Sequence, residues 1–140
     1  MRKPIPIAYV EDSPEDIRAL RGMLKEWHVV NPLEVFSTGD ELLRYLRAGV
    51  IEPGIVLVDN ALPGGMDGLD IIKALRKDHR AQLPDVPLVM VTGSDDQTAV
   101  QLARLAGADA YIVKPVGVPA LMRAINQAAP FVLEIVRASR

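Results

Sequence analysis

The feature that most constrains the fold is an alternation of short apolar runs with amphipathic segments along the chain. Five apolar runs of strand length lie at 5–10, 33–36, 55–58, 86–91 and 110–113. In the segments that follow them, apolar residues recur every three or four positions, which is the spacing of one face of a helix. Alternating strands and helices predict an α/β fold: a doubly wound, five-stranded parallel sheet with helices on both faces.

Capping residues mark the expected starts of the helices. Ser13 followed by Pro14 is typical of a helix start, and Thr38 and Asp67 hold equivalent positions before the second and third helices. In the first helix the apolar stripe continues to Trp27, which we therefore expect in the core.

Length and composition limit the classes of protein to consider. A chain of 140 residues suits one domain, with a core at about 5–129 and a helical extension at 130–140. The extension is too short for an output domain, which needs at least ~50 residues. A net charge of -2 with interspersed acids and bases argues against direct DNA binding. The apolar runs are too short to span a membrane and no signal peptide precedes them, so we expect a cytoplasmic protein.

Polar residues follow the apolar runs at the positions where the strands should end. Glu11 and Asp12 follow the first run, Asp59 the third, Thr92 the fourth and Lys114 the fifth. Ligands of doubly wound sheets bind beside these carboxyl ends. Three carboxylates gathered there require a cation, and an all-oxygen ligand set favours Mg2+. An aspartate nucleophile with hydroxyl and ammonium groups nearby indicates phosphoryl transfer.

These residues give the sequence a resemblance to the receiver domains of two-component response regulators. The resemblance covers roughly 7–128, and the matching segments are Glu11-Asp12, 57–63, Met66-Asp67-Gly68, Val91-Thr92-Gly93, 107–111 and Lys114-Pro115. It implies a flavodoxin-like fold of the receiver type. The short form is similar to stand-alone regulators encoded beside sensor kinases, bacteriophytochromes among them.

The resemblance implies a phosphorelay function for the strand-end residues. Asp59 would accept a phosphoryl group from a sensor histidine kinase or a histidine phosphotransfer protein. Asp12, Asp59 and the Ala61 carbonyl would hold Mg2+, and Glu11 would act through water. Such a domain promotes its own phosphorylation and dephosphorylation and is not an enzyme with turnover.

The resemblance also implies a conformational switch. Thr92 and Tyr111 would move on phosphorylation and reshape the face of the fourth helix, fifth strand and fifth helix, although Tyr111 can also be read as an ordinary half-buried strand residue. The peptide bond before Pro115 would be cis, an uncommon state. Ala61 and Ser94 hold positions linked to the rate of dephosphorylation.

Three alternatives remain open at this point. The same fold can serve as a phosphorylation-independent pseudo-receiver, although the intact set of acids, threonine and lysine argues against it. A phosphatase with an aspartyl-phosphate intermediate would carry a second acid where this chain has Ala61, which disfavours that class. The apolar residues Phe131, Val132 and Ile135 either pack on the domain or form a homodimer contact.

Overall fold

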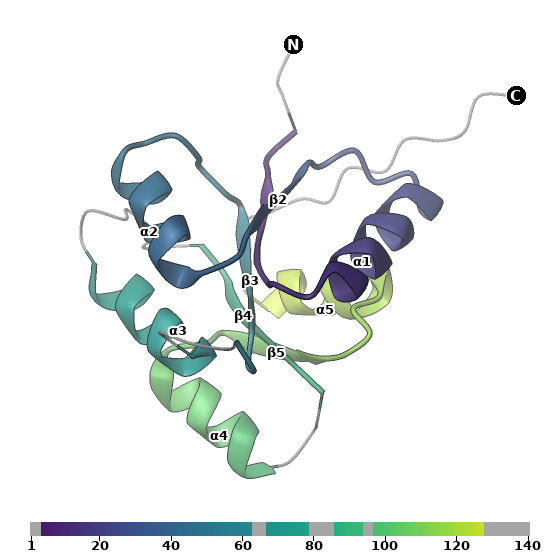
Figure 1. Ribbon diagram of the computed structural model, residues 1–140. Helices are drawn as coiled ribbons and strands as arrows, with labels where there is room; N and C mark the ends of the chain where they lie inside the picture. Colours follow the sequence, from purple (N-terminus) through teal and green to yellow (C-terminus); the bar gives the residue numbers. More distant parts are fainter. Residues whose placement is uncertain (1–3, 63–66, 79–85, 94–96, 128–140) are drawn as a thin grey trace, which may run out of the picture.

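Five parallel strands form the centre of the molecule (Figure 1). The computed structural model describes residues 4–62, 67–78, 86–93 and 97–127. Their strands pair in the order β2-β1-β3-β4-β5. The strands are β1 (Ile7–Val10), β2 (Leu33–Phe36), β3 (Ile55–Asp59), β4 (Leu88–Thr92) and β5 (Ala110–Val113). The predicted five-stranded parallel sheet is confirmed.

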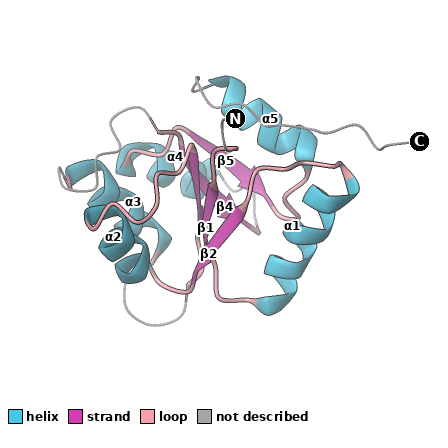
Figure 2. Ribbon diagram, turned by 90° about the horizontal axis from the view of Figure 1, so that it is seen from above, coloured by secondary structure: helices cyan, strands magenta, loops and turns pink. Residues whose placement is uncertain are grey.

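Helices cover both faces of the sheet, as the alternation predicts. They are α1 (Pro14–Glu26), α2 (Gly39–Arg47), α3 (Gly68–Lys77), α4 (Gln97–Ala106) and α5 (Val118–Gln127). Figure 2 shows α1 and α5 on one side of the strands and α2, α3 and α4 on the other. Each side buries its own apolar cluster against the sheet. No helix among the described residues is long and apolar enough to cross a membrane.

The predicted caps of the first three helices are present. The side chains of Ser13, Thr38 and Asp67 each accept a hydrogen bond from the backbone N–H three residues further on. These bonds satisfy donors that the first helical turn leaves without partners. The caps therefore fix the starts of α1 at Pro14 and of α3 at Gly68.

The prediction that Trp27 lies in the core is wrong, because 41% of its surface is exposed. Helix α1 ends at Glu26, and the chain turns through His28 with a φ of 56°. The helical spacing that would carry Trp27 onto the buried face therefore stops one residue too early. Leu24, which is 5% exposed, is the last buried residue of the stripe.

Two strands begin later than the apolar runs predict. The runs start at positions 5 and 86, whereas β1 begins at Ile7 and β4 at Leu88. A proline precedes each observed start, Pro6 and Pro87 respectively. Proline has no N–H to donate to a neighbouring strand, which explains why regular pairing begins one residue after it.

A carboxylate connects three elements at the opposite end of the sheet from the predicted site. Asp109 accepts a hydrogen bond from the Leu88 N–H at 2.8 Å and forms an ion pair with Arg76 of α3. Arg76 also donates to the carbonyl of Gly107 at 2.9 Å. The start of β4, helix α3 and the chain leading into β5 thus share one polar cluster.

Asp109→Ala is expected to lower the free energy of unfolding by about 1–2 kcal/mol, because the Leu88 N–H would lose its acceptor in a buried strand. Urea unfolding measures the change. Asp109→Asn keeps an acceptor oxygen and loses only the charge toward Arg76, so its loss should be smaller. An unchanged unfolding midpoint for Asp109→Ala would contradict this account.

Candidate functional site

The strand-end residues are gathered at one edge of the sheet, as expected for parallel strands. Glu11 and Asp12 directly follow β1, Asp59 and Thr92 are the last residues of β3 and β4, and Lys114 directly follows β5. Glu11, Asp59 and Thr92 are at most 5% exposed. Charged and hydroxyl groups buried at a strand end cost free energy unless they have partners, so their contacts define the site.

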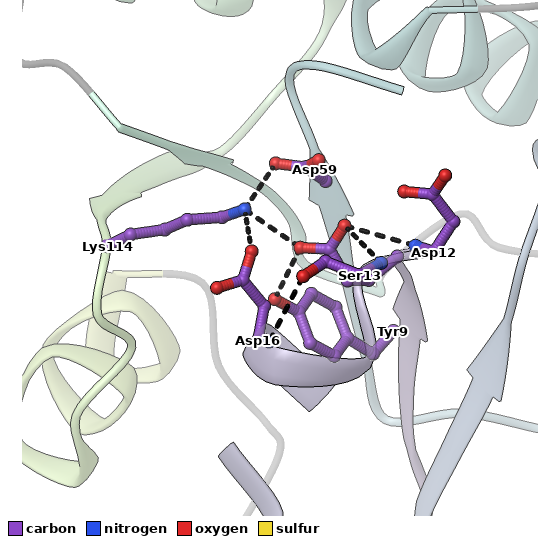
Figure 3. A network of polar contacts seen from close by, with 7 residues as sticks. Tyr9, Asp12, Ser13, Asp16, Asp59 and Lys114 are labelled. Carbon is purple, nitrogen blue, oxygen red and sulfur yellow. Dashed lines mark hydrogen bonds and ion pairs between the residues drawn. The ribbon is translucent and has the colours of Figure 1, made fainter. Parts of the chain in front are cut away.

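Lys114 is the cation at the centre of this cluster. Its Nζ lies 2.8 Å from Glu11 Oε1, 2.6 Å from Asp16 Oδ2 and 3.0 Å from Asp59 Oδ1 (Figure 3). Burial alone would lower the pKa of Lys114, but the hydrogen bonds to Asp16, Glu11 and Asp59 raise this pKa well above its ordinary value. The ammonium therefore stays charged at neutral pH and balances carboxylates from β1, α1 and β3.

Glu11 is held by four donors of the protein. Its Oε1 accepts hydrogen bonds from the Tyr9 hydroxyl at 3.2 Å and from Lys114, and its Oε2 accepts from the backbone N–H groups of Asp12 and Ser13 at 3.1 and 3.4 Å. Burial raises the pKa of Glu11. This carboxylate is thus a fixed anchor for Lys114 and is the least accessible acid of the cluster.

Asp12 lies apart from the contacts of Lys114. Its side chain is exposed, and Figure 3 shows its carboxylate pointing away from the ammonium. In the described part of the chain no hydrogen bond to this carboxylate is found, and no three His, Cys, Asp or Glu side chains are grouped to hold a metal ion. Asp12, Asp59 and the carbonyl of the exposed Ala61 nevertheless offer only oxygen donors, which suit a hard divalent cation that keeps several waters.

Thr92 and Tyr111 face a common space beyond the carboxylates. Both line a small cavity of about 10 Å³, which also borders α4 through Val100. Thr92 is buried and Tyr111 is half-buried. The two residues predicted to form a switch are thus brought together next to the helix that the switch would move.

Of the remaining predicted features, the structure describes the peptide bond before Pro115 but not Ser94 or the C-terminal apolar residues. The peptide bond between Lys114 and Pro115 is cis, in agreement with the expectation. Ser94 and the C-terminal residues Phe131, Val132 and Ile135 lie outside the described residues.

Two members of the cluster were not predicted from the sequence. Asp16 was interpreted only as an acid in the first turn of a helix, and Tyr9 only as a strand residue. The signal for Asp16 was its position in the first turn of α1, the helix that directly follows the acids at the end of β1. Tyr9 lies two residues before Glu11, so both side chains project on the same side of the strand. Burial raises the pKa of Tyr9, which keeps its hydroxyl protonated as a donor to Glu11.

Known proteins match this chain over most of its length. The family model described as "Response regulator receiver domain" matches residues 7–126. Protein PilH of Pseudomonas aeruginosa is 33% identical over 121 residues, which cover 86% of this chain and 93% of PilH. The bacteriophytochrome response regulator AtBRR is 28% identical with a TM-score of 0.79, and the match covers 97% of this chain and all of AtBRR.

A second structure shares the fold at lower identity. The Mn(2+)-bound form of response regulator Rcp1 is 23% identical with a TM-score of 0.69, covering 86% of this chain and 88% of Rcp1. The PilH and AtBRR matches take in nearly all of those two stand-alone regulators. The chain therefore belongs to the response regulator receiver domain family, whose members are signalling modules of two-component systems.

Proposed function

We propose that this protein is a phosphoacceptor response regulator in which Asp59 takes a phosphoryl group from a phosphohistidine. The observation that carries the proposal is the position of Asp59. This residue ends the central strand, its side chain is 5% exposed, and its carboxylate lies 3.0 Å from the Lys114 ammonium. Receiver domains interact with kinases or phosphotransfer proteins. The donor in this proposal is therefore a sensor histidine kinase or a histidine phosphotransfer protein.

The chemistry requires a positioned nucleophile and positive charge on the transferred oxygens. A carboxylate oxygen of Asp59 would form the new bond to phosphorus while the bond from phosphorus to the donor nitrogen breaks, and the imidazole would leave with that electron pair. Lys114 would then pair with a phosphoryl oxygen, and the Thr92 hydroxyl would donate a hydrogen bond to another. The strand end holds Asp59 in place before the donor arrives.

Mg2+ is the cation proposed for this site. Asp12, Asp59 and the Ala61 carbonyl would hold it, with Glu11 acting through water. When bound, the ion would add positive charge beside the transferred oxygens. Two observations support this assignment: the exposed Asp12 carboxylate has no protein donor within the described residues, and all candidate ligands are oxygens. A protein of the same fold, Rcp1, is described in a Mn(2+)-bound form.

The signal would leave through the face formed by α4, β5 and α5. Thr92 and Tyr111 line one cavity beside α4, so a shift of Thr92 toward a phosphoryl group would make room for Tyr111. This face carries exposed apolar side chains, namely Leu102, Leu105, Val113 and Met122. Contacts with a partner protein or a second copy would differ between the two states, as any population shift requires.

Intact mass spectrometry after incubation with acetyl phosphate and Mg2+ tests the proposal. We expect a gain of one phosphoryl group that disappears when EDTA removes the metal. A phosphohistidine donor serves as the second arm, because it offers a different leaving group. Failure with both donors would contradict the proposal and favour a phosphorylation-independent interaction module.

A further inference from the structure

The shortest contact of Lys114 is made with Asp16, a residue to which the proposed phosphoryl transfer gives no role. Nζ lies 2.6 Å from Asp16 Oδ2, against 2.8 Å for Glu11 and 3.0 Å for Asp59. The backbone N–H of Asp16 donates to the Ser13 cap at 3.3 Å, which fixes this residue in the first turn of α1. The hydrogen bond from Lys114 also lowers the pKa of Asp16, so its carboxylate is charged at neutral pH.

The donors of Lys114 are fully used in this arrangement. An ammonium has three N–H groups, and three carboxylates surround it. A phosphoryl group on Asp59 would bring additional oxygens that need a cation. To reach one of them, Lys114 must give up or weaken one of its present contacts.

Of the two carboxylates that stay ionised when Asp59 carries a phosphoryl group, Asp16 is the one whose contact can be given up more easily. The side chain of Glu11 is 1% exposed and that of Asp59 is 5% exposed, whereas that of Asp16 is 38% exposed. Water can solvate the Asp16 carboxylate once the ammonium has left. It cannot do this for Glu11, where an unpaired buried charge would be costly.

We propose that Asp16 is a positioning residue that holds the Lys114 ammonium in the unphosphorylated protein and competes with the phosphoryl oxygens for it. This inference rests on the proposed function. The competition slows phosphoryl uptake, because the approach of the donor must displace Asp16 from the lysine. It also links the first turn of α1 to the state of Asp59.

Asp16→Asn tests the competition in the full chain. We expect phosphoryl uptake from acetyl phosphate to accelerate about twofold to fivefold, the size expected for loss of a partly exposed ion pair. Time-resolved intact mass spectrometry with Mg2+ gives the rate. Glu15→Gln is the matched control, since it removes the same charge from the adjacent exposed residue, which is not among the ion-pair partners of Lys114 found in the described residues.

A second comparison separates an effect through Lys114 from a general effect of charge. In a Lys114→Gln background, Asp16→Asn should change the rate no more than Glu15→Gln does, because there is no ammonium to release. Donor concentration and incubation time are raised until the slow uptake of the Lys114→Gln protein can be measured. Persistence of the full acceleration without the lysine would overturn the inference.

The outcomes distinguish the inference from the function on which it rests. If the wild-type protein takes up no phosphoryl group from acetyl phosphate or a phosphohistidine donor, both fail. If the wild type is phosphorylated and Asp16→Asn behaves like Glu15→Gln, only the role of Asp16 is wrong. Thermal unfolding of each variant verifies that the compared proteins are folded.

Discussion

Asp59→Asn is expected to reduce phosphoryl uptake to less than about 1% of the wild-type rate, because an amide oxygen is neutral and a poor nucleophile compared with a carboxylate. The fold should persist, since Lys114 keeps its contacts with Glu11 and Asp16. Intact mass spectrometry with acetyl phosphate and Mg2+ measures uptake. Urea unfolding reports whether stability is retained.

Asp70→Asn is a suitable control for this variant. Asp70 is an exposed acid in the first turn of α3, and the same change there should leave uptake unaltered. Phosphoryl uptake by Asp59→Asn at a rate near that of the wild type would contradict the proposal. Peptide mapping would then identify the carboxylate that accepts the group.

Gly68→Ala is expected to destabilise the protein by about 2–3 kcal/mol, because the added methyl group meets backbone and not a movable side chain. A Cβ at Gly68 would lie 2.5 Å from the Asp59 carbonyl oxygen and 2.9 Å from the Asn60 Cα. Helix α3 would have to move away from the end of β3. The same shift would displace Asp59, so phosphoryl uptake should fall together with stability.

Gly22→Ala is a control for which the opposite change in stability is expected. Gly22 lies in the middle of α1, is exposed, and has nothing within 4 Å of a Cβ built on it. Alanine should therefore raise stability by up to ~1 kcal/mol through helix propensity. Urea unfolding gives the change in the free energy of unfolding for both variants. Gly68 represents a glycine packed against backbone, and Gly22 represents an ordinary helical glycine. A loss below about 0.5 kcal/mol at Gly68 would show that the crowding is relieved elsewhere.

The order of strands and helices could be predicted because it depends on local periodicity. The predicted bounds of an element were wrong where a local feature changed the residue at which the element begins or ends. Proline delayed the starts of β1 and β4, and the end of α1 at Glu26 left Trp27 exposed. Neither effect can be read from hydrophobic spacing alone, because both depend on where backbone hydrogen bonding begins or stops.

The candidate site was only partly predictable for a different reason. The rule that parallel strands end at one edge gathers Glu11, Asp59, Thr92 and Lys114 without knowledge of any side-chain contact. The same rule does not predict which carboxylates form ion pairs with Lys114. The contact with Asp16 depends on the direction in which α1 leaves β1 and on the path of the lysine side chain, and these follow from tertiary packing.

The hydrogen bond between Lys114 and Glu11 joins positions 103 apart in the chain. A ribosome releases the chain from its amino-terminal end, so Glu11, Asp16 and Asp59 all emerge well before their lysine. During that interval the three acids lack the Lys114 ammonium, and the interval ends only when β5 has joined the edge of the sheet. If the proposed function holds, a nascent chain is therefore expected to take up no phosphoryl group until β5 has been synthesised and has joined the sheet.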